Sequence, residues 1–346
     1  MHEVDRTVSL RQSGFVFYCG SGCASSKIET MILLWIGVFI GSLLALLKGS
    51  DWLLRGAERI GVHFKLSRFT IGVLIVGVGT SLPELASSIS AIFHGMTEIA
   101  SANVIGSNIY NILFIIGITA IIGKKLTVTK DLMDSELPIF LVATIIFLGV
   151  AYDGKIGFVE ALLLFLGYLI YLFHTLRDTE DFNPVVTDVK RDVKLLRSKL
   201  GGIFLVFFLG LAGVLAGAKF MVDAVIQIAE VLHIAPEIVS LTAVALGTAL
   251  PELFISIRAL KQGKSDIAIG NVFGSNAFNL LMVIGVTGLF STVTISSVSY
   301  TIGLPMLAAS TFIFLVFGIS KSVYRWEGFM LLVLFAFFIL RVLGIG

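Results

Sequence analysis

Charged side chains are scarce in this sequence, and so are the residue types that form catalytic and metal centres. Asp, Glu, Lys and Arg together make up 14% of the 346 residues, with two Cys and five His. Soluble domains carry charge on about a quarter of their residues, so this composition excludes a soluble globular chain. The formal charge of +2 gives no indication of a nucleic-acid partner. Cys19 and Cys23 lack the neighbouring ligands that would complete a metal site.

Apolar residues are abundant instead, at 57% of the chain with 28 Phe and a mean hydropathy of +0.99. A helix that crosses the membrane needs about 20 apolar residues, and ten segments meet that length. The sequence therefore predicts an all-α polytopic membrane protein with ten transmembrane helices. These are expected near residues 31–61, 66–93, 98–122, 133–152, 156–175, 201–232, 236–260, 266–290, 297–319 and 325–344.

Polar segments divide the chain. Residues 1–30 are polar and predict a disordered tail, with Met31 as an alternative translation start, while residues 176–200 form the long polar break between apolar runs. Five predicted helices therefore lie in 31–175 and five in 201–346. Basic residues gather in the loops after odd-numbered helices, so the positive-inside rule predicts that loop 176–200 is cytoplasmic and that both termini are extracytoplasmic. Because each half has an odd number of helices, corresponding elements cross the membrane in opposite senses.

The long first and sixth helices carry charges in mid-span. Asp51 and Arg55 lie four residues apart in the first helix, and Lys219 and Asp223 lie four residues apart in the sixth. Each pair is therefore able to neutralise itself along its own helix. The expected role of these charges is pairing or snorkelling, not transport.

One polar stretch occurs twice. Its first copy is Gly79-Thr-Ser-Leu-Pro-Glu84 with Gly106-Ser-Asn-Ile-Tyr-Asn111, and its second is Gly247-Thr-Ala-Leu-Pro-Glu252 with Gly274-Ser-Asn-Ala-Phe-Asn279. One constant offset relates every matched position, from Glu84 to Glu252 as from Asn111 to Asn279, so the stretches are an internal repeat. We call this constant separation the repeat offset. Inverted repeats are typical of secondary transporters, which bind their substrates near the membrane midplane where the repeats meet.

Glu84 and Glu252 are the residues of the repeat that are least favourable inside a membrane. A carboxylate in the middle of a membrane helix costs at least about 2.5 to 3.5 kcal/mol by insertion scales, and it faces a bundle interior or a water-filled cavity. A hydroxyl lies one helical turn before and one turn after each glutamate, at Thr80, Ser88, Thr248 and Ser256. The two polar stripes are expected to face each other and to share a cation or protons.

A proline precedes each glutamate. Pro83 and Pro251 remove a helical hydrogen bond and clash with the carbonyl four residues earlier, which belongs to Gly79 or Gly247. A freed carbonyl at membrane depth must line a cavity or coordinate an ion. With the carboxylates and hydroxyls, these carbonyls make an all-oxygen environment that suits Ca2+ or Na+ and disfavours zinc, copper and iron.

The helix that follows in each copy adds neutral oxygens. Ser107 and Asn111 lie one turn apart in the first copy, and Ser275 and Asn279 lie one turn apart in the second. On a regular helical wheel Asn108 and Asn276 point elsewhere, so they are expected to serve helix packing or capping.

These motifs resemble the two alpha repeats of the Ca2+/cation antiporter superfamily, and within it the Na+/Ca2+ exchangers. Those repeats carry a Gly-Thr-Ser-x-Pro-Glu segment and a Gly-Asn-x-x-Gly-Ser-Asn segment. The matches here are GTSLPE from Gly79, ANVIGSN from Ala102, GTALPE from Gly247 and GNVFGSN from Gly270. The resemblance covers residues 31–346. It implies two inverted five-helix halves, several ion positions between the repeats, and alternating access by movement of the first and sixth helices.

By position, the resemblance implies that Glu84 and Glu252 bind Ca2+ and share in Na+ binding. It implies that Thr80 and Thr248 contribute backbone carbonyls. It also implies peripheral Na+ positions at Ser81, Ser107 and Ser275.

Two positions depart from the Na+-selective pattern of the family. Asn279 stands where an aspartate is common, and Ala249 stands where Ser81 has its counterpart. Both changes remove ligands for small cations. H+, K+ and Li+ therefore stay open as driving ions beside Na+.

The leading hypothesis is a secondary active antiporter that exchanges Ca2+ for Na+ across the cell membrane, as a monomer, without a cofactor or a nucleic-acid partner. An intramembrane hydrolase would need two acids that share a proton, or catalytic histidines at membrane depth. His63, His94, His174 and His233 all fall near predicted helix ends. A passive cation channel is the third alternative. The sequence thus predicts a transporter with Ca2+, Na+ and the lipid bilayer as partners, and not an enzyme.

Overall fold

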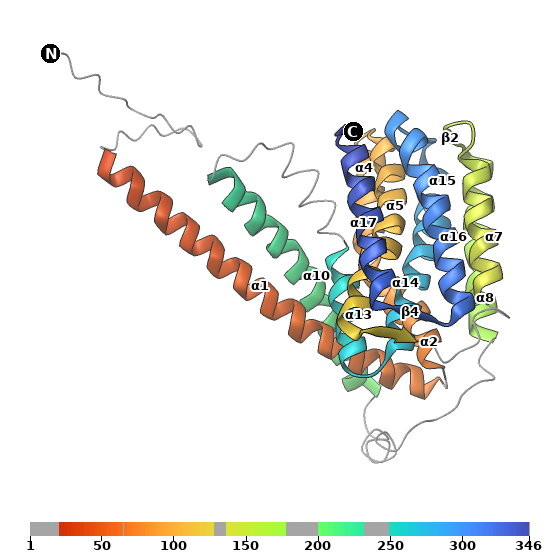
Figure 1. The fold of residues 1–346 in the computed structure, drawn as a ribbon, viewed down its shortest axis with the longest axis horizontal. Helices are drawn as coiled ribbons and strands as arrows, with labels where there is room; N and C mark the ends of the chain where they lie inside the picture. Colours follow the sequence, from red (N-terminus) through yellow and green to blue (C-terminus); the bar gives the residue numbers. More distant parts are fainter. Residues whose placement is uncertain (1–20, 65, 128–135, 178–199, 232–248, 346) are drawn as a thin grey trace.

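The computed structural model describes residues 21–64, 66–127, 136–177, 200–231 and 249–345. Most helices stand side by side in an upright bundle. The long helices α1 (Ser21–His63) and α10 (Leu200–Val231) lie against each other and run obliquely away from that bundle (Figure 1). Seven helical stretches in the described residues are long and apolar enough to cross a membrane. The chain is thus a helical membrane protein.

The first half continues after α1 with several helices and two short strands. They are α2 (Arg68–Thr70), the π-helix η1 (Ile71–Gly77), α3 (Val78–Thr80), α4 (Leu82–Phe93), α5 (Thr97–Tyr110), the π-helix η2 (Asn111–Ile115), α6 (Ile116–Gly123), β1 (Lys125–Thr127), α7 (Glu136–Val150), β2 (Lys155–Ile156) and α8 (Phe158–Arg177). The second half follows α10. It contains α13 (Leu250–Lys261), α14 (Ser265–Ala277), the π-helix η4 (Phe278–Val283), α15 (Ile284–Phe290), β3 (Val293–Thr294), the π-helix η5 (Ser299–Gly303), α16 (Leu304–Ser320), β4 (Ser322–Tyr324) and α17 (Arg325–Val342).

Each predicted apolar segment overlaps a helix, although the seventh is described only from Ala249 onward. The first helix begins at Ser21, well before the predicted start at residue 31. Residues 1–20, most of loop 176–200 and residues 232–248 lie outside the described residues. Residues 21–30 are helical, so the predicted disordered tail is wrong for them. The rest of that tail, the count of ten membrane crossings and the division into inverted halves stay predictions.

The helical stretch that runs through α14, η4 and α15 is at the centre of the bundle. In its most apolar part, 94% of the residues are buried inside the protein. Peripheral helices instead expose large apolar side chains, such as Phe173 on α8, Phe312 on α16 and Val333 on α17. Such surfaces are typical of contact with lipid. The polar motif residues of α14 are therefore enclosed by protein.

Glycines let η1 and α14 cross with their backbones in contact. A Cβ at Gly274 would lie 2.1 Å from the carbonyl oxygen of Val73, and a Cβ at Gly72 would lie 2.6 Å from the carbonyl oxygen of Ile267. These distances leave no room for a side chain, so this crossing requires Gly. It brings a helix of the first motif copy directly beside a helix of the second.

Glycines join α1 to α10 in the same way. A Cβ at Gly49 would lie 2.7 Å from the Val214 amide nitrogen, and a Cβ at Gly217 would lie 2.9 Å from the Leu46 amide nitrogen. The repeat offset converts one contact into the other, and the two contacts show that the helices run in opposite directions. With parts of η1, α13 and α14, these helices bury a hydrophobic cluster that is distinct from the main core. We call α1 and α10 together the α1–α10 unit.

Two short antiparallel strand pairs connect the halves at helix ends. β1 pairs with β4, with Lys125 opposite Tyr324, and β2 pairs with β3, with Ile156 opposite Val293. The two registers correspond by the repeat offset. Lys125 in the first half matches Val293 in the second, and Tyr324 in the second half matches Ile156 in the first. Each pair takes one strand from each half, so the halves are tied together at two places.

Candidate functional site

The two polar stretches interrupt their helices just before the prolines. Ser81 separates α3 from α4 with φ −87° and ψ 6°, and Ala249 precedes α13 with φ −92° and ψ 3°. A new helix begins at the next residue in each case, so Pro83 and Pro251 occupy its first turn. In that turn a missing N–H leaves no hydrogen bond unmade. The prolines thus start new helices, whereas the sequence predicts them inside longer ones.

Both glutamates belong to these helix starts. Glu84 lies in the first turn of α4 and Glu252 in the first turn of α13, and each is 1% exposed. The N-terminus of a helix carries a positive partial charge, which stabilises a carboxylate there. The break in each helix therefore makes a buried acidic side chain more tolerable at this depth.

Polar side chains of the two halves meet where η1 crosses α14. Ser81 donates a hydrogen bond of 3.3 Å from its Oγ to Oε1 of Glu252. Thr80 Oγ1 lies 3.3 Å from Oδ1 of Asn271 and 3.5 Å from Oγ of Ser275. All five side chains are buried. The structure therefore brings four predicted site residues, Thr80, Ser81, Ser275 and Glu252, into one cluster.

Asn103 and Asn271 are not among the predicted site residues, yet each forms hydrogen bonds with a helix that carries one of the two glutamates. Asn103 Nδ2 lies 3.4 Å from the carbonyl oxygen of Glu84 and 3.2 Å from the hydroxyl of the serine one turn later. Asn271 Nδ2 lies 3.3 Å from the carbonyl oxygen of Glu252 and 3.1 Å from the corresponding serine hydroxyl. The repeat offset converts one arrangement into the other. That offset, applied to every polar residue of the repeat, is the sequence signal that finds them.

Besides Asn271, four buried asparagines lie on the helices that follow the motif turns. Asn111 donates from Nδ2 to Oδ1 of Asn276 at 2.9 Å, so the expectation that Asn276 points away from the site residues is wrong. Asn108 does turn away, since its Nδ2 bonds to the Val104 carbonyl oxygen on its own helix at 2.8 Å. Asn279 is 0% exposed, and neither polar atom of its amide has a hydrogen-bond partner in the described residues.

The remaining predicted residues fall into two groups. Ser107 is 7% exposed on α5, and Gly79 is buried with its Hα side toward Leu211 and Phe207 of α10. Gly247 and Thr248 lie outside the described residues, as does His233. The other predicted helix-end histidines are placed as expected, with His63 at the end of α1, His94 after α4 and His174 in the last turn of α8.

The chemistry of the cluster is that of oxygen and amide groups. No three His, Cys, Asp or Glu side chains gather in one place within the part of the chain that the structure describes. Oε2 of Glu252 and Oδ1 of Asn111 and of Asn279 are buried oxygens with no hydrogen-bond partner among the described residues. Buried acceptors without a partner are costly, and a cation is one kind of group that can satisfy such oxygens. Carboxylate, amide and hydroxyl oxygens suit hard cations such as Ca2+ and Na+.

Comparison with known proteins identifies the family of the chain. The sodium/calcium exchanger protein family model matches residues 34–177 and, separately, residues 202–344. Sodium/calcium exchanger MaX1 of Methanosarcina acetivorans is 31% identical over 338 residues, which cover 87% of this chain and 96% of that protein. Sodium/potassium/calcium exchanger 4 of Homo sapiens is 34% identical over 130 residues, which cover 35% of this chain and 20% of that protein.

A solved structure has a similar fold over most of the chain. The sodium-calcium exchanger NCX_Mj, soaked with zero Na+ and Ca2+, matches with a TM-score of 0.75 and 30% identity, covering 88% of this chain and 98% of that one. Two separate family matches, a full-length relative and this structure agree with the duplicated acidic motif. The chain therefore belongs to the sodium/calcium exchanger protein family, whose members are transporters of the Ca2+/cation antiporter superfamily and not enzymes.

Proposed function

We propose that this protein is a secondary active antiporter that exchanges Ca2+ for Na+ across the cell membrane by alternating access. The observation that carries the proposal is the buried hydrogen bond between Ser81 and Glu252. It joins the hydroxyl of one motif copy to the carboxylate of the other. The names of MaX1 and NCX_Mj as sodium/calcium exchangers support the choice of ions.

The proposed Ca2+ ligands are Glu84 and Glu252, whose two negative charges balance one Ca2+. Proposed neutral ligands are Thr80, Ser81, Ser107, Asn111, Thr248, Ser275 and Asn279, with backbone oxygens near the helix breaks at Gly79–Pro83 and Gly247–Pro251. Two uncompensated carboxylates are costly in a low-dielectric interior. An empty site therefore resists closure, and Ca2+ and Na+ must alternate as the ions that neutralise it.

The proposed architecture has ten transmembrane helices in two inverted halves, residues 31–175 and 201–346. Loop 176–200 is cytoplasmic and both termini are extracytoplasmic. Three duplicated geometries support the inversion: the opposite directions of α1 and α10, the shared register of the strand pairs, and the matched contacts of Asn103 and Asn271.

Ion flux into reconstituted vesicles tests the proposal. Vesicles that contain the purified protein are loaded with Na+ and diluted into Na+-free buffer with radioactive Ca2+, beside protein-free vesicles. We expect uptake that requires the outward Na+ gradient and stops when a Na+ ionophore removes it. Uptake indifferent to that gradient would reject Na+ as the driving ion.

A Ca2+ antiporter driven by H+, K+ or Li+ is the second candidate. Asn279 and Ala249 favour it, because the first replaces a carboxylate and the second a hydroxyl of the Na+-selective pattern. The same vesicles, loaded in turn with K+, Li+ or acidic buffer, distinguish these ions. Uptake without any opposing gradient, together with single-channel conductance in planar bilayers, would instead identify a passive channel.

A further inference from the structure

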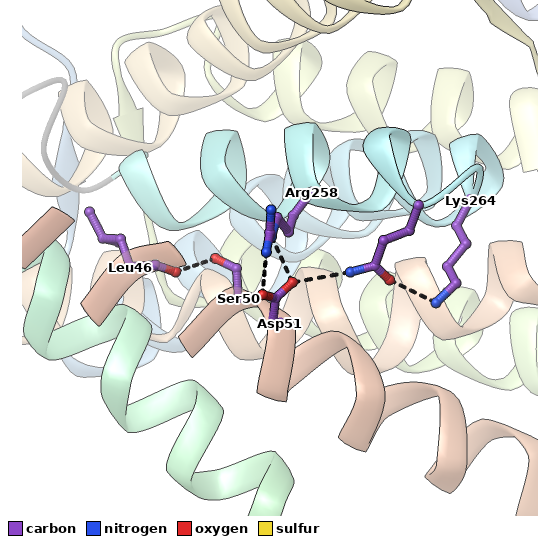
Figure 2. Close-up of polar contacts among 6 residues, drawn as sticks. Leu46, Ser50, Asp51, Arg258 and Lys264 are labelled. Atoms are coloured by element: carbon purple, nitrogen blue, oxygen red, sulfur yellow. Dashed lines mark hydrogen bonds and ion pairs between the residues drawn. The ribbon is translucent and has the colours of Figure 1, made fainter. Parts of the chain in front are cut away.

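A series of polar contacts fastens α1 to the end of α13. Asp51 on α1 accepts a hydrogen bond of 2.6 Å from Nε of Arg258 and a second one from the same guanidinium. Gln262, in the turn after α13, donates to Asp51 at 3.2 Å, and Lys264 donates to Gln262 at 2.8 Å and to Glu58 on α1 at 2.7 Å. Figure 2 shows Asp51 between Arg258 and the contacts that lead to Lys264. We call these five residues the α1–α13 latch.

The latch can be weakened without leaving a buried charge alone. The Asp51 side chain is 10% exposed and the Arg258 side chain is 34% exposed, so the pair is partly shielded from solvent. Lys48 and Arg55 lie one turn to either side of Asp51 on α1. Their positive charges continue to balance the carboxylate when Arg258 is neutralised. A variant without the Arg258 charge is therefore expected to fold.

Whatever holds α1 also holds α10. A Cβ at Gly56 would lie 2.6 Å from Cα of Phe207, and a Cβ at Gly210 would lie 2.3 Å from the Leu53 amide nitrogen. With the contacts at Gly49 and Gly217, the two backbones touch over several turns. Close packing of this kind favours movement of both helices as one body. The latch thus fixes the position of the whole α1–α10 unit on the bundle.

The latch joins α1 of the first half to α13 of the second, and the repeat-related positions carry no matching ion pairs. By the repeat offset, Asp51 corresponds to Lys219 and Arg258 to Ser90. Likewise Glu58 corresponds to Ile226, and Lys264 corresponds to Met96. Neither counterpart can form an ion pair. The packing is one-sided as well, because α1 packs along α13, whereas α10 and α4 are not packed along each other in the described residues.

We propose that the α1–α13 latch holds the α1–α10 unit in the described position and thereby favours one of the two states of the transport cycle. The inference rests on the proposed function, in which inverted halves exchange surroundings between the two states. In the second state α10 lies beside α4, and Lys219 then faces Ser90 where Asp51 now faces Arg258. The described state has ion pairs that the second state lacks.

Distances between spin labels on α10 and α4 measure the balance of the two states. The labels are attached to Cys introduced at Phe220 and Phe93, whose side chains are 52% and 71% exposed. Cys19 and Cys23 are replaced by Ser, and the full-length protein is reconstituted in lipid nanodiscs. The distance between the labels is long in the described state and short in the second state, where α10 lies beside α4. Arg258→Gln should increase the ratio of the short-distance to the long-distance population about fivefold, the effect expected for the loss of one partly exposed ion pair.

Variants at the counterpart positions control for loss of charge. Lys219→Gln removes a positive charge from α10 and should leave the distance distribution unchanged. Ser90→Asp places a carboxylate opposite Lys219 in the second state, so it should also increase the short-distance population. Ser90→Asp combined with Lys219→Gln should not. Arg258→Lys keeps the positive charge, so its distance distribution should stay closer to that of wild type than the distribution of Arg258→Gln.

An unchanged distribution in folded Arg258→Gln protein overturns the proposal, as does an equal response to Lys219→Gln. If Arg258→Gln fails to fold, Ser90→Asp decides the question. Na+-driven Ca2+ uptake by the same protein tests the proposed function separately. Exchange with an unchanged distribution rejects the latch alone, and a shifted distribution without exchange rejects the proposed function alone.

Discussion

Ser81 and Glu252 are 171 positions apart in the sequence, and a buried hydrogen bond of 3.3 Å joins them. The counterpart of Ser81 in the second motif copy is Ala249, which has no hydroxyl. Glu252 thus receives a side-chain hydrogen bond that the repeat does not provide at the corresponding position for Glu84. The motif is duplicated, but the surroundings of its two carboxylates differ.

Ser81→Ala should weaken ion binding. The variant removes the hydrogen bond to Oε1 of Glu252, and bonds to charged groups contribute about 1.5 to 3 kcal/mol. We expect the Ca2+ concentration for half-maximal vesicle uptake to rise about tenfold, since about 1.4 kcal/mol corresponds to that factor. Ala249→Ser is the matched variant, because it adds the missing hydroxyl to the other copy and should not raise that concentration. Equal losses in both variants would contradict the role of Ser81.

Glu84→Gln and Glu252→Gln should each abolish Ca2+ uptake while the protein remains folded. Gln keeps the shape of the side chain, but a single remaining carboxylate no longer balances a divalent cation. Removal of a buried charge also predicts a melting temperature at or above that of wild type. Glu98→Gln changes an exposed acid in the first turn of α5 and should retain uptake. Uptake near wild type in either glutamate variant would remove the site assignment.

Asn271→Ala should impair the site more than Asn103→Ala. Asn271 is 0% exposed and contacts Thr80 as well as the α13 backbone, whereas Asn103 is only partly buried. Buried groups left unpaired cost about 1 to 3 kcal/mol, so we expect a lower melting temperature and a weaker apparent Ca2+ affinity in Asn271→Ala. Thermal melts and Ca2+ titrations of uptake measure both. A larger effect at Asn103 would reverse the assignment.

Gly274→Ala should prevent η1 and α14 from crossing. Its methyl group would lie 2.1 Å from the Val73 carbonyl oxygen. The nearest atoms all belong to the Val73 backbone, which cannot rotate away as a side chain can. We expect little folded protein by size-exclusion chromatography. Gly149→Ala on α7 is the control, since nothing lies within 4 Å of its added methyl group. A Gly274→Ala protein that elutes and melts like wild type would show that the helices cross differently.

Asn279→Asp should make exchange more dependent on monovalent ions. A third carboxylate favours an additional Na+ or a bound proton at a site whose two glutamates balance one Ca2+. The Na+ dependence of uptake should therefore be steeper in the variant than in wild type. Ca2+ uptake by vesicles loaded with a series of Na+ concentrations measures it, and identical Na+ dependence in the variant and wild type would contradict this expectation.

The sequence predicts the helices well because hydropathy reports the length of chain that lipid can cover. The expected segments 98–122 and 266–290 agree closely with helices at 97–123 and 265–290. The start of α1 is predicted less well, since polar residues from Ser21 onward continue a helix that hydropathy detects only in its apolar part. Short strands such as β1 have no hydropathy signal of their own.

Partners within the site are harder to predict, because spacing fixes a helix face but not the neighbour that it meets. The spacing of Asp51 and Arg55 predicts a pair along α1, whereas the structure gives Asp51 a partner on α13, Arg258. Asn276 is predicted away from the site but accepts a hydrogen bond from Asn111, where the π-helix η2 begins. Glycine contacts then decide which faces meet.

The strand pairs β1–β4 and β2–β3 have a consequence for how the chain matures. Each half supplies one strand to each pair, so a first half that leaves the ribosome alone has two open strand edges. Those edges are paired only when the second half is present, so we expect the two halves to assemble after the second has been synthesised. If the protein is cut within loop 176–200 and produced as two fragments, the fragments should consequently reassemble, because each one supplies the strands that pair with the open edges of the other.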